Sequence, residues 1–275
     1  MKKRTRFTIT IAILVFIILN SCTKETLETD NESSTAVVES YIEPGQDVYV
    51  KLKKLIPFVE DGYTGSTTID SASIFINYNG VDFLLTPVNG EAGFYKCLDS
   101  NLLVEAGKTY GLSFVYNNET VYSETTIPSK PQNLYSSVSV YYVDPDAGFG
   151  SSQEPLSIYW DNLDNSYYQI IVEYLDQTYK PIRENMGEET FDDFRKFSAE
   201  PIDGDAYDLN TRRQLVFFGN YRLILYKVNQ EYVNLYENIS QSTLNLTEPL
   251  TNIDNGLGIF TGINSDTLSL QVREL

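Results

Sequence analysis

The stretch SIFINYNGVDFLL, residues 73–85, places two runs of apolar and β-branched residues on either side of Asn79-Gly80. Both central positions of a type I′ turn need a positive φ, which Asn and Gly adopt most readily. The stretch therefore predicts a β-hairpin. A second hairpin is predicted around Asn117-Asn118, because strand-like runs at 108–116 and 120–127 flank that pair.

The same alternation of apolar and polar residues recurs at short spacing from Thr35 to Ile127. It predicts seven strands, at 35–42, 48–55, 69–78, 81–86, 93–97, 108–116 and 120–127. Seven short strands within about 100 residues are typical of an immunoglobulin-like β-sandwich. The following segment, 128–131, holds two prolines in four residues, which interrupt strand pairing. We therefore expect a first domain at 35–128 and a second at 129–275.

The second domain begins with a strand-like run at 134–143. A strand at 155–160 then ends in Trp160, and an acidic turn leads to another strand at 167–174. This order resembles the B–C region of a fibronectin type III sandwich. Later strands are predicted at 221–228 and 268–272, and short helices at 188–197 and 229–240. The sequence thus predicts an all-β fold with two β-sandwich domains, the second fibronectin type III-like with helical insertions.

The N-terminus has the features of a bacterial lipoprotein signal. Four basic residues precede an apolar run at 7–19, and Cys22 follows Leu19-Asn20-Ser21. An apolar run of about 7–15 residues fits a signal peptide better than a membrane-spanning helix. We expect a signal peptide at 1–21, lipidation of Cys22 and a flexible stalk at 22–34. An uncleaved anchor and ordinary cleavage without a lipid are the alternatives.

The composition excludes several classes of function. Beyond the signal the chain has 16 basic and 38 acidic residues, and such a surface repels nucleic acid. The chain has no histidine, which excludes catalytic sites whose nucleophile is activated by histidine and zinc sites with histidine ligands. With Cys22 lipidated, Cys97 has no disulfide partner within the chain, and its strand-like surroundings predict a buried thiol. We expect a protein that is not an enzyme and holds no cofactor.

Candidate binding residues lie mainly in the second domain. Its first part is crowded with aromatic residues, which predict either a sugar or peptide platform or a sandwich core: Tyr135, Tyr141, Tyr142, Phe149, Tyr159, Trp160, Tyr167 and Tyr168. Core packing is favoured for Trp160. The candidates for ligand or partner contact are Phe149, which lies in a glycine-containing loop, and the neighbouring Tyr141 and Tyr142; core packing is the alternative.

Acidic residues offer two further hypotheses. Asp203, Asp205 and Asp208 resemble part of a calcium loop, although the closing Glu of such a loop is missing. The acids of the segment 188–193 would have to supply any carboxylate-based hydrolysis, and these are Glu188, Glu189, Asp192 and Asp193. Solvated acids at a turn and at a helix start are the alternatives.

Several landmarks occur in the order found in one family. They are Cys22, the opening VVESYIEPG (37–45), DSASI (70–74), GFY (93–95), GKTY (107–110), TTIP (125–128) and NGLGIF (255–260). Together they resemble the outer-membrane lipoproteins of the Bacteroidota grouped as domain of unknown function 4249. The family's Asn-Pro-rich approach to the last motif is replaced here by Leu246–Leu250.

The resemblance implies a lipoprotein accessory to a TonB-dependent outer-membrane transporter, and it implies no catalytic residue or ligand. The leading hypothesis is therefore a lipid-anchored, non-enzymatic envelope protein of the outer membrane that assists nutrient uptake. It would contact the membrane through Cys22 and a transporter through its folded part. An adhesin or structural surface protein is the alternative, and a carboxylate-based hydrolase is a third.

Overall fold

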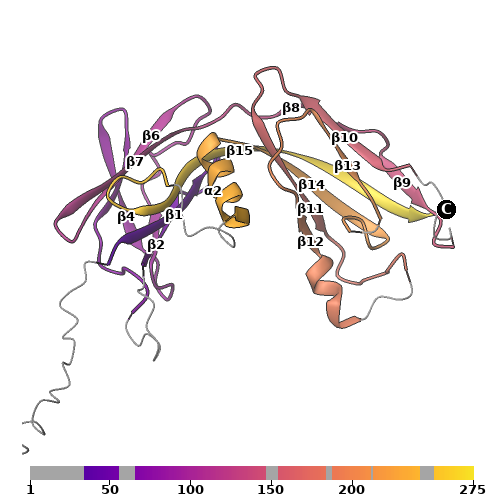
Figure 1. Ribbon diagram of the computed structural model, residues 1–275, viewed down its shortest axis with the longest axis horizontal. Coiled ribbons are helices and arrows are strands. Elements are labelled where there is room, and N and C mark those ends of the chain that lie inside the picture. Colours follow the sequence, from indigo (N-terminus) through magenta and orange to yellow (C-terminus); the bar gives the residue numbers. More distant parts are fainter. Residues whose placement is uncertain (1–33, 56–65, 147–153, 184–187, 212, 242–250) are drawn as a thin grey trace, which may run out of the picture. The chain divides into compact units, whose positions relative to one another are not determined.

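The computed structural model describes residues 34–55, 66–146, 154–183, 188–211, 213–241 and 251–275 (Figure 1). By its contacts the chain divides into two compact units, Met1–Ser34 and Thr35–Leu275. All of the helices and strands described lie in the second unit, and they are almost entirely strands. The expected all-β fold is confirmed. No helix of the described residues is both long and apolar enough to cross a bilayer.

The first sandwich is formed by seven strands that closely follow the predicted ranges. Antiparallel pairing joins them in the order β1-β2-β5-β4-β3-β6-β7. Their bounds are β1 (Ala36–Ile42), β2 (Tyr49–Lys54), β3 (Ile74–Tyr78), β4 (Val81–Pro87), β5 (Phe94–Cys97), β6 (Thr109–Tyr116) and β7 (Glu119–Thr126). Alternate residues of each strand point into one core, which also buries Cys97 as predicted.

The two predicted hairpin turns are present. Asn79 and Gly80 have φ values of 51° and 76°, and Asn117 and Asn118 have values of 49° and 64°. Two successive positive φ angles are the property of a type I′ turn, whose twist matches that of the flanking strands. Each turn sets the register of its hairpin, with Tyr78 opposite Val81 and Tyr116 opposite Glu119.

The second sandwich has two sheets around a second core. One sheet has the order β13-β10-β8, and the other runs β12-β11-β14-β15, with β9 pairing in parallel with β15. The bounds are β8 (Gln132–Ser136), β9 (Val140–Val143), β10 (Leu156–Asp161), β11 (Tyr167–Tyr174), β12 (Lys196–Ser198), β13 (Ala206–Leu209), β14 (Gly219–Val228) and β15 (Leu257–Glu274). This pairing pattern is that of a fibronectin type III-like sandwich.

Two aromatic residues support that description. Trp160 is buried in the second core as predicted, with its ring centroid 5.5 Å from that of Tyr168. At the start of β14, the Tyr221 hydroxyl donates a hydrogen bond of 2.9 Å to the Phe217 carbonyl and accepts one from the Phe217 N–H. This contact matches the tyrosine corner of immunoglobulin-like sandwiches.

The last strand, β15, is much longer than the predicted 268–272. Its first part pairs in parallel with β1 from Leu257 to Gly262, and the rest pairs antiparallel with β14 from Ile263 to Val272 (Figure 1). Ile253 and Phe260 belong to the core of the first sandwich. The domain division at residues 128 and 129 stays a prediction, but the first core includes residues far beyond it in sequence.

The remaining differences are local. The predicted strand at 134–143 is two strands, β8 and β9. The predicted helix at 188–197 is a 3-10 helix, η1 (Glu188–Phe194), followed by β12. The spacing of three between Phe191 and Phe194 matches the three residues per turn of a 3-10 helix. The predicted helix is therefore present but shorter, because Phe197 belongs to β12. The other predicted helix is present as α2 (Gln230–Gln241).

Candidate functional site

The candidate site lies on the outer face of β4, β3, β6 and β7 in the first sandwich. Strand register places Leu84 opposite Phe75, Phe75 opposite Ser113, and Ser113 opposite Tyr122. These four residues form one row across four strands. Leu84 and Tyr122 keep 51% and 37% of their surfaces exposed, so part of the row is apolar surface in contact with solvent.

The segment before β3 makes this face uneven. Strand pairing between β3 and β6 covers only Phe75, Ile76 and Asn77, although β6 continues to Tyr116. The preceding backbone bonds to buried Tyr95 instead. The Tyr95 hydroxyl donates to the Ile69 carbonyl at 2.8 Å and accepts from the Ala72 N–H at 3.0 Å. This is also why β3 begins at Ile74 and not at the predicted residue 69.

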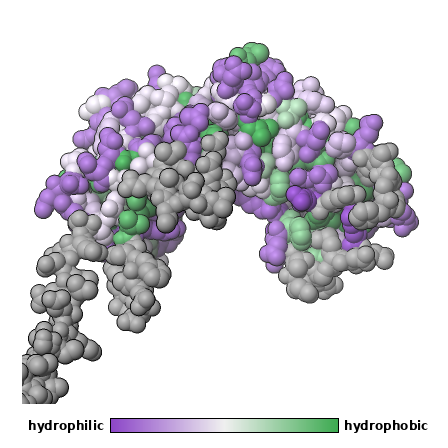
Figure 2. All heavy atoms as spheres, viewed as in Figure 1, coloured by the Kyte–Doolittle hydropathy of each residue, from purple (hydrophilic) through white to green (hydrophobic). Residues whose placement is uncertain are grey.

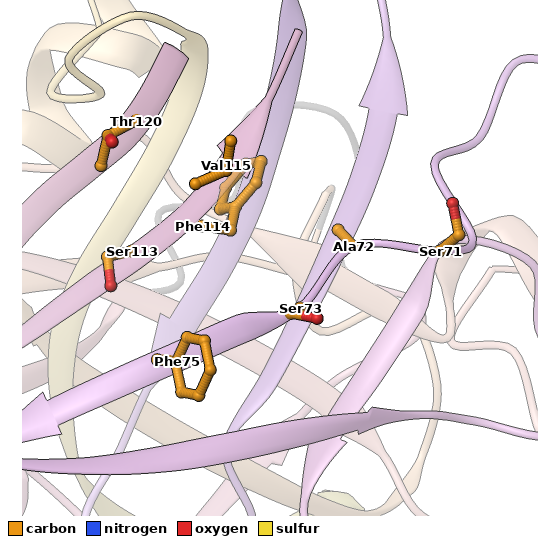
Figure 3. A pocket seen from close by; sticks show the side chains of 8 residues that line it. All are labelled: Ser71, Ala72, Ser73, Phe75, Ser113, Phe114, Val115 and Thr120. Carbon is orange, nitrogen blue, oxygen red and sulfur yellow. The ribbon is translucent and has the colours of Figure 1, made fainter. Parts of the chain in front are cut away.

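An open hollow of about 330 Å³ lies where β3 would otherwise continue along β6 (Figure 3). Its lining combines small hydroxyl groups with apolar side chains and carries no charge: Ser71, Ala72, Ser73, Phe75, Ser113, Phe114, Val115 and Thr120. Val115 is 64% exposed at the border of the hollow. Such a lining offers shape, hydroxyl groups and apolar contact, and it presents neither a nucleophile with an adjacent base nor an acid–base pair.

Acidic side chains lie beside this uncharged face. Asp82 and Glu124 are exposed on β4 and β7, in the strand row next to that of Leu84 and Tyr122, and neither takes part in an ion pair that the structure describes. Asp82 accepts a 2.8 Å hydrogen bond from the Asn77 amide. The hydrogen bond between Tyr122 and Glu124 raises the pKa of Tyr122. The face is therefore apolar and hydroxyl-rich at its centre and negative along one side of its rim.

Carboxyl pKa shifts in the described residues follow ordinary ion pairing. Lys96 lowers the pKa of Asp47, and Lys227 lowers that of Asp164. Burial by itself would raise the pKa of Glu173, but hydrogen bonds from Arg222 and Lys196 outweigh it and the pKa is lowered. A general acid near neutral pH needs a raised carboxyl pKa, and these three shifts run the other way.

The aromatic residues predicted to contact a partner have different surroundings. Tyr141 is buried, and its hydroxyl donates a 2.6 Å hydrogen bond to the Glu154 carbonyl. These surroundings are those of a packing residue, which is the core alternative for the aromatic cluster, and ligand contact by Tyr141 stays a prediction. Tyr142 is 50% exposed on β9. Phe149 lies outside the described residues, and so does the predicted lipidation site Cys22.

The calcium candidates are not brought together. The described residues contain no group of three or more His, Cys, Asp or Glu side chains that could hold a metal ion. The Asp208 carboxylate instead accepts a 2.6 Å hydrogen bond from the Ser157 hydroxyl. The backbone carbonyl of Asp203 accepts from the Asn162 amide, and that of Asp205 accepts from the Trp160 N–H. The acidic loop is thus held by backbone contacts to β10 and the following turn.

The proposed carboxylate pair is not supported either. The side chains of Glu188 and Glu189 lie outside the described part of the structure. Asp192 accepts a short hydrogen bond from the Tyr179 hydroxyl, and Asp193 is exposed. The outer face around the hollow was missed at the level of sequence. Its signal was the apolar residues at outward-facing strand positions, Leu84 in the first hairpin and Val115 in the second.

Comparison with known families gives a match over residues 23–269 to the family described as Domain of unknown function (DUF4249). The chain belongs to this family. Membership in DUF4249 confirms the resemblance drawn from the ordered landmarks, among them the NGLGIF motif at the start of β15. The lipid anchor and the bacterial phylum stay predictions.

Among solved structures, the fold is similar to the FN1–FN3 domains of chicken CNTN1, with 10% identity and a TM-score of 0.29, covering 87% of this chain and 67% of that one. A Salmonella alpha-2-macroglobulin mutant is similar at 12% identity and a TM-score of 0.23, covering 88% of this chain and 15% of that one. No curated protein matches the sequence. The all-β description rests on the strands themselves and not on these similarities.

Proposed function

We propose that this DUF4249 protein is a lipid-anchored, non-enzymatic envelope protein that assists nutrient uptake at a TonB-dependent outer-membrane transporter. The observation that carries the proposal is the uncharged hollow and apolar row on the open face of the first sandwich. A surface of this kind offers non-covalent contact with another macromolecule, since exposed apolar patches bordered by polar residues mark interaction sites.

The anchor supports the same proposal. Cys22 follows an apolar run and precedes β1 by a short polar segment. Acylation there would hold the first sandwich close to the bilayer, within reach of a transporter embedded in it. Three acyl chains, as carried by the lipoproteins that this signal resembles, exceed the two signals that stable anchoring needs.

Charge indicates what the contact surface of the transporter should be. The rim acids Asp82 and Glu124 lie along one side of an apolar centre (Figure 2 shows how hydrophilic most of the visible surface is). The complementary surface would present apolar side chains with Lys and Arg along the matching side. Such rim charges act mainly on the rate and selectivity of association, and apolar contacts at the centre provide most of the affinity.

Co-purification in mild detergent tests this proposal. The wild-type lipoprotein should recover a transporter barrel, and the double variant Leu84→Asp/Val115→Asp should lose at least about nine tenths of it, because two buried charges would face apolar groups. Leu163→Asp is the matched control, since Leu163 is 92% exposed on the second sandwich. Unchanged melting temperatures would show that the variants fold.

Three results would count against the proposal. Repeated recovery of the wild-type protein alone would contradict binding to a transporter. Equal recovery of the transporter with the double variant would show that this face is not the contact surface. Mass spectrometry that finds no acyl chains on Cys22 would contradict the proposal that the protein is lipid-anchored. Binding to host matrix without any growth defect after deletion would favour the adhesin alternative.

A further inference from the structure

The outer face of the three-stranded sheet β13-β10-β8 carries a second exposed surface with different chemistry. Tyr135 on β8 lies opposite Tyr159 on β10, and Tyr159 lies opposite Ala206 on β13. The two tyrosine rings are stacked, with centroids 5.2 Å apart and planes at 27°. Because β8 is the edge strand of this sheet, no strand of the described residues pairs beyond it on the far side of Tyr135, which is 55% exposed.

A β-bulge places a polar group on one side of the tyrosine pair. The register between β10 and β8 shifts between Tyr159 and Asp161, and Asn133 within the bulge has a φ of 53°. Bulges commonly redirect a side chain at the cost of regular pairing. Here the Asn133 amide donates a 2.6 Å hydrogen bond to Oδ2 of Asp161. The bulge therefore holds an oriented carboxylate beside the rings.

The other side of the pair has a matching arrangement. Ser157 lies two residues before Tyr159 on the same outward face, and its hydroxyl donates a 2.6 Å hydrogen bond to Oδ1 of Asp208. In the described structure, neither Oδ1 of Asp161 nor Oδ2 of Asp208 receives a hydrogen bond from a protein group. Each carboxylate is thus oriented through one oxygen and keeps the second available as an acceptor.

We propose that this surface, made of Tyr135, Tyr159, Asn133, Asp161, Ser157 and Asp208, binds a neutral saccharide. Aromatic rings stack against the C–H faces of a sugar ring, and carboxylate oxygens accept hydrogen bonds from its hydroxyls. The register rows that form the surface contain no Lys or Arg, so an anionic ligand would meet two uncompensated carboxylates. Saccharide binding itself does not depend on the proposed function. Only its biological role does, since in nutrient uptake the bound saccharide would be the nutrient.

The test uses the full mature chain with Cys22→Ser, which avoids detergent, on an array of neutral glycans followed by calorimetric titration of the strongest binder. Tyr135→Ala should raise the dissociation constant at least about tenfold, since it removes the exposed stacking face. Tyr135→Phe keeps the ring and should bind within about threefold of wild type. Tyr49→Ala is the matched control, because Tyr49 is a comparably exposed tyrosine (42%) on the first sandwich.

Absence of wild-type binding to every neutral glycan on the array would overturn the proposal, and so would binding that Tyr135→Ala leaves unchanged. A hexa-arginine peptide is the competing probe. The surface recognises basic peptides instead if three results coincide: the peptide binds the wild-type protein, the variant Asp161→Asn/Asp208→Asn no longer binds it, and no glycan binds. None of these results depends on a transporter, so failure here is distinct from failure of the proposed function.

Discussion

At the scale of single residues, close backbone approaches decide how the last strand joins the first sandwich. Gly258 has a φ of 98°, and a Cβ at this position would lie 1.9 Å from the Val38 carbonyl oxygen. Only glycine allows β15 to lie this close to β1 at that point. This explains in physical terms why the NGLGIF motif contains a glycine where the strand begins.

Gly258→Ala should therefore destabilise the protein strongly. We expect a loss of about 3 kcal/mol or more in the free energy of unfolding, from the clash together with the unfavourable φ. Urea denaturation measures it. Gly45→Ala is the matched control, because Gly45 also has a positive φ (76°) but a Cβ there would meet no atom within 4 Å. Equal losses in the two variants would show that conformation alone, and not the approach to Val38, sets the requirement.

At the scale of elements, β15 and α2 join parts of the chain that are distant in sequence. Residues 257–262 pair with β1, and the segment just before them contacts β7, where Tyr122 and Asp254 exchange backbone hydrogen bonds. Glu231 in the first turn of α2 accepts 2.9 Å hydrogen bonds from the hydroxyls of Thr125 on β7 and Thr261 on β15. The first sandwich is therefore completed only when the C-terminal part of the chain arrives.

It follows that the fragment 35–128 should not fold stably by itself. Without residues 251–262, its core lacks Ile253 and Phe260, and the facing edges of β1 and β7 are unpaired. Truncating one buried Phe to Ala typically costs about 3–5 kcal/mol. This is a large share of the free energy of unfolding of a typical domain, which is about 5–15 kcal/mol. Adding a peptide of residues 251–263 should restore dispersed NMR signals.

The same peptide with Phe260→Ala is the control, and it should restore much less of the fold because Phe260 is fully buried in the first core. Cooperative unfolding of the fragment 35–128 without any peptide would contradict this expectation and would make the first sandwich an independent domain.

At the scale of the whole molecule, the absence of histidine and the abundance of tyrosine determine how stability depends on pH. The chain has 21 Tyr and no His. Burial raises the pKa of Tyr41 to about 12, and it raises the pKa of Tyr95, Tyr110 and Tyr221 as well. Such groups stay protonated in the folded protein at a pH where they ionise in the unfolded chain.

The free energy of unfolding should accordingly change little between about pH 6 and 9, where few side chains of this composition titrate. Because the folded pKa of these tyrosines lies above the unfolded value, their contribution is complete below about pH 10 and is lost as the pH rises toward the folded pKa. At the acidic end the sign is opposite. The lowered pKa of Asp164 and Glu173 gives stability above about pH 4 that is lost as the pH falls.

Urea midpoints measured from about pH 3 to 11, together with tyrosinate absorbance, check this profile. A stability change centred near about pH 6.5 would contradict it, because that is where histidine would titrate and this chain has none. Tyrosinate absorbance that rises at about pH 10 without any loss of structure would show that the buried hydroxyls are more accessible than their surroundings indicate.

The sequence by itself determined the local structure of this protein. Alternation with a period of two identified the strands of the first sandwich, and Asn79-Gly80 and Asn117-Asn118 specified turns with positive φ, since both signals act between neighbours in the chain. The tertiary structure alone decided which distant strands meet. Pairing of β15 with β1, departure of 69–72 toward Tyr95, and the stacking of Tyr135 on Tyr159 join residues whose contacts leave no local pattern. Both candidate surfaces take their shape from such long-range contacts. The sequence indicated Tyr135 and Tyr159 as members of an aromatic cluster, but it could not show that the two rings stack or that β3 leaves a hollow beside β6.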